Sequence, residues 1–248
     1  MTRAIDLNAD VGEGFADAEL MPFLTSCSIA CGGHAGDEAT MREAVRLAVK
    51  HDLAIGAHPS FPDRAGFGRT LTTIDPAAIE ALVSEQIVRL ADVARREGAR
   101  LAHVKPHGAL YNLAARDGDA AHAIARAVRR TLPDAALLLL AGSRALEVAR
   151  AEGLRALAEG FVDRGYRGDG TLAARGSAGA LITDPESAAA QALAIAAHGR
   201  VATIDGGSLA LAADTLCLHS DTPGASAIAE RVSRRLRDAG IAVARPAG

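Results

Sequence analysis

The chain of 248 residues is long enough for one α/β barrel or sheet with a sizeable core, because 49% of its residues are hydrophobic although only 3% are aromatic. Positive and negative side chains are mixed throughout, for a formal net charge of -3, which excludes a basic face of the kind that binds nucleic acid. No segment approaches the roughly 18 uncharged apolar residues of a membrane span, and no signal peptide precedes Asp6, so we expect a cytoplasmic protein without a membrane partner.

Short apolar runs bounded by glycine or polar residues alternate with longer stretches of helical period along the chain. This alternation is typical of repeated βα units around a mostly parallel sheet. The predicted strands cover residues 4–10, 28–32, 53–58, 101–105, 136–141, 157–161, 201–204 and 215–219. The predicted helices cover residues 39–51, 76–97, 120–132, 143–152, 185–198 and 223–239. Seven or eight strands in one unbroken series indicate a single barrel domain over residues 1–248.

Proline and glycine mark the ends of several predicted helices. Asp75, Asp184 and Thr222 each precede a proline, and such residues cap a helix whose first turn holds the proline. The glycines that follow predicted helices are Gly98, Gly153, Gly199 and Gly240.

The first strand carries polar side chains at alternate positions, Asp6, Asn8 and Asp10, with apolar residues between them. On a strand this spacing aims all three at one face. A buried polar face must be hydrogen-bonded, metal-bound or in contact with substrate, because an unpaired buried polar group costs roughly 1 to 3 kcal/mol. Asp6 lies deepest and is expected to be structural, whereas Asp10 and Glu13 lie near the mouth, where barrels build their sites. Carboxylates this close split their pKa values, so one can be protonated while another serves as base or metal ligand.

The second strand leads into Gly32-Gly33-His34, whose glycines allow the backbone to approach a ligand closely. His34 is predicted to contact substrate, a metal ion or a catalytic water, and Asp37 could cap the next helix, orient His34 or bind a cation. A zinc site of Cys27, Cys31 and His34 is disfavoured, because structural zinc normally takes four ligands in paired spacings. Three cysteines in the whole chain also fit reduced thiols better than a disulfide framework.

Histidines recur where the predicted strands end. The five are His34, His58, His103, His107 and His219. Because the carboxyl ends of barrel strands meet at one rim, this recurrence favours a shared site. The other histidines, which lie in or beside helical segments and are expected at the surface, are His51, His122 and His198.

Cationic side chains accompany these histidines. Arg64 and Arg69 follow His58 in a proline-rich loop, and either could bind an anionic substrate or pair with Asp63. Lys105 shares a strand face with two of the histidines, so its ammonium could pair with an acid such as that of the first strand or stabilise an oxyanion or phosphoryl group. The residues that follow it in the chain and are predicted to complete the wall are Tyr111 and Asn112.

The C-terminal half contains a glycine-rich stretch, residues 159–181, with neither helix nor strand period. It predicts a long excursion over the barrel mouth, either a lid or a solvated loop. The last strand leads through His219 and Asp221 into a helix whose N-terminus could bind a phosphate or carboxylate, and Asp221 could equally cap that helix. No glycine-rich phosphate-binding motif is present, so the residues that would bind a nucleotide cofactor are unknown.

Five motifs in one order resemble the LamB/YcsF family. They are Asp6-Leu7-Asn8-Ala9-Asp10 with Gly12-Glu13-Gly14, Ile29-Ala30-Cys31-Gly32-Gly33-His34-Ala35-Gly36-Asp37, Ile55-Gly56-Ala57-His58-Pro59-Ser60-Phe61-Pro62-Asp63-Arg64, His103-Val104-Lys105-Pro106-His107-Gly108-Ala109-Leu110-Tyr111-Asn112 and Asp221-Thr222-Pro223-Gly224-Ala225. The resemblance runs from residue 5 to about residue 240. The chain departs from the family's usual pattern at Cys27-Ser28 and at Ser220, and it keeps every candidate acid, base and lysine.

The resemblance implies a distorted seven-stranded, TIM-like β/α barrel similar to the glycoside hydrolase/deacetylase superfamily. Members of the family are known as the A subunit of a bacterial ATP-dependent 5-oxoprolinase. The implied reaction is therefore the ring opening of 5-oxo-L-proline to L-glutamate, with ATP cleaved to ADP and phosphate. It also implies two partner subunits, B and C.

Under this resemblance, the partners would carry most of the phosphorylation, and this chain would direct water to the activated ring. The reaction requires ATP with Mg²⁺, and the sequence leaves open whether the partner subunits or this chain bind them. The catalytic residues would be Asp10 or Glu13 as base, His34 and His107 as proton-transfer groups, and Lys105 at the phosphoryl or oxyanion group. The substrate-binding residues would be Asn8, His58, Arg64, His103, Tyr111, Asn112, His219 and Asp221.

Two alternatives stay open. The chain could be a metal-dependent deacetylase, in which Asp10, His34, His58 and His107 hold a divalent ion as in the structurally related deacetylases. It could also be a regulatory component that binds a small acid without catalysis. The sequence leaves open whether the chain binds a metal of its own and whether it forms a homo-oligomer.

Overall fold

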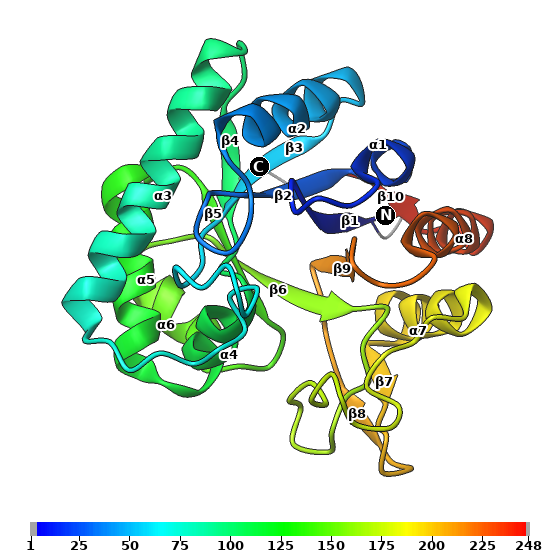
Figure 1. Ribbon diagram of the computed structural model, residues 1–248. Helices are drawn as coiled ribbons and strands as arrows, with labels where there is room; N and C mark the ends of the chain where they lie inside the picture. Colours follow the sequence, from blue (N-terminus) through cyan, green and yellow to red (C-terminus); the bar gives the residue numbers. More distant parts are fainter. Residues whose placement is uncertain (1–3, 247–248) are drawn as a thin grey trace.

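Seven parallel strands close into a barrel in the computed structural model, which describes residues 4–246 (Figure 1). The strands are β1 (Ala4–Val11), β2 (Ser26–Ala30), β3 (Ala54–His58), β4 (Leu101–Val104), β5 (Ala136–Leu140), β6 (Ala156–Phe161) and β9 (Thr215–His219). Each strand pairs with the next from β1 to β6, and β9 closes the ring by pairing with both β6 and β1. The expected seven-stranded α/β barrel is confirmed. Its distortion includes a register shift between Ile55 and Gly56, where β3 meets β4.

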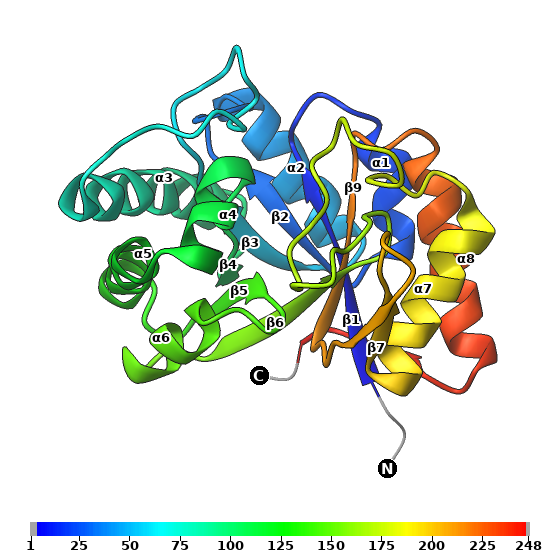
Figure 2. The same cartoon turned by 90° about the horizontal axis from the view of Figure 1, so that it is seen from below.

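Helices surround the barrel on its outside (Figures 1 and 2). They are α1 (Asp17–Leu20), α2 (Glu38–Lys50), α3 (Pro76–Arg96), α4 (Gly108–Arg116), α5 (Gly118–Thr131), α6 (Ala145–Ala151), α7 (Pro185–His198) and α8 (Ala225–Asp238), with a 3-10 turn at Met21–Phe23. The short α1 and α4 were not predicted. No helix within residues 4–246 combines the length and the hydropathy needed to cross a membrane.

Three of the five candidate helix caps are confirmed, and Asp221 is not a cap because α8 begins four residues after it. The side chains of Asp37, Asp75 and Asp184 each accept a hydrogen bond from a backbone N–H in the first turn of their helix. The prediction of Thr222 as a cap is wrong, because α8 begins only at Ala225, after Gly224 in the left-handed region. The Thr222 hydroxyl instead donates a hydrogen bond to the buried carboxylate of Asp163 at the mouth of the barrel.

The predicted strand at residues 201–204 does not belong to the barrel. Residues Arg200–Ala202 form β7, which pairs antiparallel with β8 (Ser208–Ala210) in a separate hairpin beside α7 (Figure 1). Only Val201 of β7 is buried, so the apolar run is too short to fill a barrel position. A further strand that was not predicted, β10 (Ala242–Val243), pairs with the start of β1.

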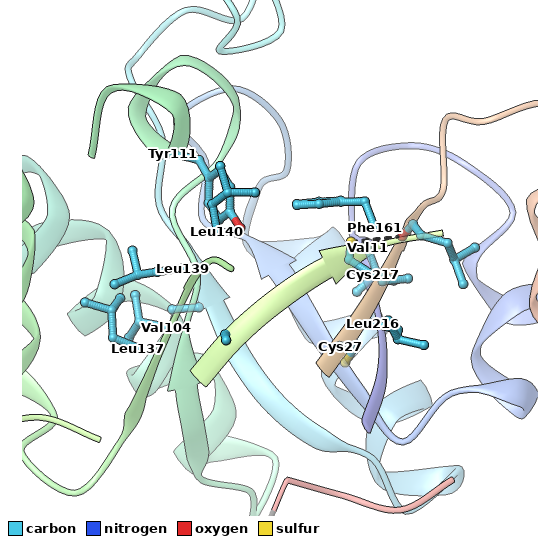
Figure 3. Packing of buried hydrophobic residues seen from close by; sticks show 14 of the residues in the cluster. Val11, Cys27, Val104, Tyr111, Leu137, Leu139, Leu140, Phe161, Leu216 and Cys217 are labelled. Carbon is cyan, nitrogen blue, oxygen red and sulfur yellow. Dashed lines mark hydrogen bonds between the residues drawn. The ribbon is translucent and has the colours of Figure 1, made fainter. Parts of the chain in front are cut away.

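The main apolar core lies between the barrel and its helices. Leu7 and Ala9 of β1 belong to this core, whereas the intervening Asn8 points into the barrel and donates hydrogen bonds to Glu159 and Thr215. The same alternation holds around the ring, because successive strand residues face opposite sides. The buried residues shown in Figure 3 include Val11, Val104, Leu137, Leu139 and Leu216. The polar residues that form the site therefore lie on the inner face of the same strands that anchor the helices.

One glycine makes room inside the barrel for a histidine. His103 is 1% exposed, and its Nε2 lies 3.1 Å from Ser28 Oγ. The neighbouring Gly56 lies directly against it, since a Cβ at Gly56 would lie 2.1 Å from His103 Nε2. The imidazole is enclosed on all sides, so it has little freedom to move away.

We predict that Gly56→Ala lowers the free energy of unfolding by about 2 kcal/mol, because the new methyl group overpacks the barrel against His103. Urea denaturation followed by circular dichroism measures the loss. In a His103→Ala background the same Gly56→Ala change should cost little, which makes the coupling between the two positions visible in a double-mutant cycle. Gly118→Ala, at a helical glycine whose Cβ would meet no heavy atom within 4 Å, is the matched control. Equal losses in both backgrounds would contradict the steric explanation.

Candidate active site

A cavity of about 790 Å³ opens at the carboxyl ends of the barrel strands. Its floor is formed by residues that end strands or directly follow them, Asp10, His58, Lys105, Phe161 and His219. Its outer walls come from the start of α4 and from the glycine-rich segment after β6. The cavity therefore lies where the sequence places the polar strand ends, as barrel sites do.

Lys105 is 2% exposed and lies at the centre of the floor. Its Nζ is 2.8 Å from Asp10 Oδ1, 3.0 Å from Glu159 Oε1 and 3.0 Å from the Sγ of Cys217. Burial alone would lower the pKa of Lys105, but the charge of Asp10 and the other neighbours raise it well above its usual range. Lys105 is therefore an ammonium held between two carboxylates.

Asp10 and Glu13 have pKa values that are pushed apart. Burial alone would raise the pKa of Asp10, yet His58 and Lys105 hold it well below its usual range. Burial raises the pKa of Glu13 well above its usual range, and the charge of Asp10 adds to this effect. Two carboxyl groups of opposite protonation state in one site are what acid–base chemistry requires.

Glu13 lies among three buried histidines, His34, His58 and His107. Its Oε1 is 2.7 Å from His34 Nε2, 3.4 Å from His107 Nδ1 and 3.8 Å from His58 Nε2. The rings of His34 and His107 are stacked, with centroids 3.6 Å apart and planes 2° apart. Burial lowers the pKa of His34 to about 3, so this imidazole is neutral at pH 7.

His219 forms a dyad with Asp163 on the other side of the cavity. The His219 Nδ1 lies 3.0 Å from Asp163 Oδ2, and the same carboxylate accepts hydrogen bonds from the His219 backbone N–H and the Thr222 hydroxyl. Although burial alone would raise it, the nearby His219 lowers the pKa of Asp163 to about 2. An ionised carboxylate on Nδ1 leaves Nε2 of His219 free to exchange a proton, as in a catalytic triad.

Arginines surround the outer part of the cavity. Those that line it are Arg69, Arg116, Arg144, Arg164, Arg167 and Arg175. Asp221 pairs with Arg69 and Arg175, whereas Arg116 and Arg144 form no ion pair with any residue from 4 to 246. Guanidinium groups therefore outnumber carboxylates at the entrance, which favours an anionic ligand.

The glycine-rich segment runs from the end of β6 to α7 and carries part of this wall. It is ordered against the β7–β8 hairpin through a bridge between Tyr166 and Thr203. Arg164 holds it together by donating hydrogen bonds to the carbonyls of Ala173 and Ala180. The segment covers one side of the cavity, and its opening and closing as a lid stays a prediction.

Most of the predicted site residues come together at this cavity. Asp10, His58, Lys105, His107 and His219 line its floor, and Tyr111 and Asn112 line its wall. Glu13 and His34 do not line the cavity but contact His58 and His107 in one buried cluster, and Asp221 joins the entrance through Arg69. Tyr111 and the strand residue Leu140, which also lines the cavity, are both labelled in Figure 3.

Three predicted residues are placed elsewhere. Asn8 and His103 lie deeper inside the barrel and do not line the cavity. Arg64 is exposed, donates a hydrogen bond to the Gly36 carbonyl and lines a different groove of about 440 Å³ beside α2 and α3. Of the two arginines in that loop, it is Arg69 that reaches the cavity, because the loop doubles back after Asp63.

The sequence interpretation assigned no chemical role to Glu159, Asp163 and Cys217, which contact the catalytic candidates directly. The sequence did contain a signal for the two acids. Glu159, Phe161 and Asp163 occupy alternate positions along the end of β6, with the same spacing as the acids of the first strand. Cys27 and Cys31 are buried free thiols, and burial raises the pKa of Cys31 to about 12. Neither belongs to a candidate metal cluster among the described residues.

Comparison with known proteins gives consistent matches over the whole chain. The LamB/YcsF family model matches residues 5–248. A protein of Heliobacterium modesticaldum that is named as the A subunit of 5-oxoprolinase is 49% identical over 245 residues, which is 96% of each chain. The crystal structure of a lactam utilization protein from Thermus thermophilus is 44% identical with a TM-score of 0.91, covering 98% of this chain and 100% of that one. The solved structure of T48 deacetylase, 15% identical with a TM-score of 0.51 over 98% of this chain and 88% of that one, shares the fold alone.

We predict that Asp163→Asn lowers the free energy of unfolding by about 2 kcal/mol at pH 7, because a pKa lowered from 3.8 to about 2 stabilises the folded state by this amount. The folded pKa lies below the unfolded one, so the stabilisation is complete above pH 3.8 and is lost as the pH falls toward 2. Urea denaturation at pH 7, 5 and 3 should show a constant difference between the two proteins at the higher values and a smaller one at pH 3. Asp134→Asn, at an exposed loop position, should change nothing. A difference that stays the same at pH 3 would contradict the assigned ionisation.

Proposed function

Because the chain belongs to the LamB/YcsF family, we propose that it is the A subunit of a 5-oxoprolinase that opens 5-oxo-L-proline to L-glutamate while ATP is cleaved to ADP and phosphate. The relatives' names support a role in 5-oxoprolinase. The observation that carries the proposal is the buried Lys105–Asp10 pair, which provides a fixed positive charge and an ionised carboxylate on the floor of one cavity.

The chemistry of the lactam explains why such a floor is useful. A five-membered lactam is a poor electrophile, and phosphorylation of its carbonyl oxygen activates the carbonyl carbon toward water. Lys105 would stabilise the negative charge of the phosphoryl group on that oxygen as water attacks the carbon and the C=N electron pair moves to the ring nitrogen. Asp10, which is ionised, would accept the proton of the water as the new C–O bond forms.

The ring nitrogen must then leave as an amine, which requires a proton. Ring opening leaves the phosphoryl group on the side chain as an acyl phosphate, and a second water hydrolyses it to glutamate and phosphate. His219 lines the cavity, and Asp163 holds it with Nε2 free, so we assign it as the donor to the ring nitrogen when the C–N bond breaks. This assignment shifts proton transfer to the leaving nitrogen from His34 and His107 to His219. His34 and His107 lie on the opposite side of Asp10, against Glu13.

Activation of the lactam is assigned to partner subunits. The relatives are named as one lettered subunit of 5-oxoprolinase, which fits an enzyme with further subunits, and the sequence contains no phosphate-binding glycine motif. We propose that subunits B and C bind ATP with its Mg²⁺ and phosphorylate the lactam. The activated ring would then reach the arginine-lined cavity of this chain.

Reconstitution tests the proposal. Glutamate release from 5-oxoproline and ATP is measured with this protein alone, with the partner subunits alone and with all of them together. We expect activity only in the full mixture. Absence of glutamate in every mixture, with release of acetate from an N-acetyl sugar by this protein alone, would replace the proposal with the deacetylase alternative. Binding of 5-oxoproline without turnover in the full mixture would favour the regulatory alternative.

In the full mixture, Lys105→Met should lower kcat about 100-fold or more, because it removes the positive charge that stabilises the phosphoryl group of the activated lactam as water attacks. Lys105→Met leaves Asp10 and Glu159 facing each other without a cation, so Lys105→Met/Glu159→Gln restores the original net charge and should fold while staying inactive. The chain's only other lysine, Lys50, is exposed, and Lys50→Met is the matched control. Near-normal activity in the folded double variant would exclude Lys105 from the reaction.

The entrance arginines are tested separately. We predict that Arg116→Gln/Arg144→Gln raises the KM for the lactam several-fold and leaves kcat within about twofold, because these groups attract the anion without touching the reacting bond. The effect should shrink as salt is added. Arg237→Gln, on the outer helix α8, is the control. A fall in kcat at unchanged KM would contradict a role in binding.

A further inference from the structure

His58 and His107 point ring nitrogens at each other across a short distance. His107 Nδ1 lies 2.9 Å from His58 Nε2. The opposite nitrogen of each ring faces a backbone carbonyl, since His58 Nδ1 is 2.7 Å from Lys105 O and His107 Nε2 is 2.9 Å from Phe67 O. A carbonyl only accepts hydrogen bonds, so in each ring the outer nitrogen carries the proton.

The two inner nitrogens therefore both present lone pairs. A neutral imidazole has one N–H, and both rings have already used theirs. Two lone pairs 2.9 Å apart repel unless a positively charged species lies between them, and both rings are buried away from water. Either an extra proton or a metal ion satisfies this requirement.

Glu13 supplies a third donor atom at the same point, because a carboxyl group that is protonated in the metal-free protein loses its proton when it binds a divalent cation. Its Oε1 lies 3.4 Å from His107 Nδ1 and 3.8 Å from His58 Nε2. Donor atoms with bonds of about 2.1 Å to one ion are separated by about 3 to 3.4 Å for bond angles between 90° and tetrahedral. The three separations in this cluster, 2.9, 3.4 and 3.8 Å, bracket that range, so a small contraction would bring all three donors onto one ion.

His34 supports this cluster but provides none of the atoms that would bind the ion. Its ring is parallel to that of His107 and 3.6 Å from it, so one ion cannot lie in the planes of both rings. Its Nε2 lies 2.7 Å from Glu13 Oε1, where an N–H donated to the carboxylate fixes the position of that oxygen. Hydrogen bonds of this kind orient metal ligands and are worth about 10- to 100-fold in affinity.

We propose that Glu13, His58 and His107 bind one divalent transition-metal ion, such as Zn²⁺, and that His34 is a positioning residue for Glu13. Compared with the set expected from the sequence, Glu13 takes the place of Asp10, and His34 moves behind Glu13. Asp10 Oδ1 is held by Lys105, and although Asp10 Oδ2 lies 3.3 Å from His58 Nε2, Asp10 does not belong to the group of donor atoms that includes His107. Two imidazoles and one carboxylate leave coordination positions open, and His58 and His107 both line the cavity. An ion there would supply a Lewis acid beside Asp10. The inference concerns the cluster itself and stands apart from which lactam is cleaved.

The test is metal binding by the full chain alone, without ATP or partners. Protein freed of metal with a chelator is dialysed against Zn²⁺ and analysed by elemental analysis, and Co²⁺ is titrated in with the visible absorption spectrum as a second readout. We expect one ion per chain, at least about 100-fold weaker binding in His58→Ala, His107→Ala and Glu13→Gln, and about 10- to 100-fold weaker binding with unchanged stoichiometry in His34→Ala. His198→Ala, at the end of α7, should bind as the parent protein does.

Two results would overturn the proposal. One is the absence of stoichiometric Zn²⁺ or Co²⁺ binding by the parent protein, which would assign the His58–His107 contact to a shared proton. The other is undiminished binding by Glu13→Gln, which keeps the size of the side chain and so guards against a variant that fails to fold. Neither result depends on glutamate release, so failure of the metal site and failure of the proposed reaction are distinguishable.

Discussion

The Lys105 ammonium lies inside the barrel with almost no exposure to water, and a charge in that position is stable only beside carboxylates. Asp10 and Glu159 meet this requirement from β1 and β6, while Lys105 itself follows β4. The ion pairs of one ammonium group thus link three strands on different sides of the ring. The lysine also helps to set the ionisation of Asp10. Burial and the charge of Asp10 raise the pKa of Glu13, whereas Lys105 itself lowers it.

Two groups of buried side chains with different chemistry lie at and behind the floor of the cavity, around this lysine. On one side, Glu13 and three histidines form a tightly packed, buried cluster suited to a cation. On the other side, His219 and Asp163 form a dyad that can carry a proton at the edge of the cavity. Asp10 touches both sides, since its Oδ2 lies 3.3 Å from His58 Nε2 and its Oδ1 is bound by Lys105.

The sequence was sufficient to predict the barrel and the rim that holds the site, because alternation along strands and polar strand ends are local patterns. It failed where tertiary contacts decide. Residues 201–204 have the composition of a strand, but β9 and not β7 fills the gap between β6 and β1. The sequence offers no reason to prefer Arg64 or Arg69 as the residue at the cavity. The fold of their loop decides, because it places Arg64 beside the Gly36 carbonyl and Arg69 beside Asp221. The expected metal ligands stay a prediction, but only the fold shows that the acid grouped with His34, His58 and His107 is Glu13.

Closure of the ring by β9 also bears on how the protein is made. The partners of β9 on one side belong to β1, so that Asp6 pairs with Thr215 across some two hundred residues of intervening chain. A growing chain that has been synthesised only through β6 exposes the unpaired edges of β1 and β6, and it still lacks His219. The members of the histidine cluster all come from the first 107 residues, so this cluster can assemble early. The His219–Asp163 dyad can form only after β9, the last barrel strand, has been inserted. The candidate site is in this way completed only when synthesis has nearly ended.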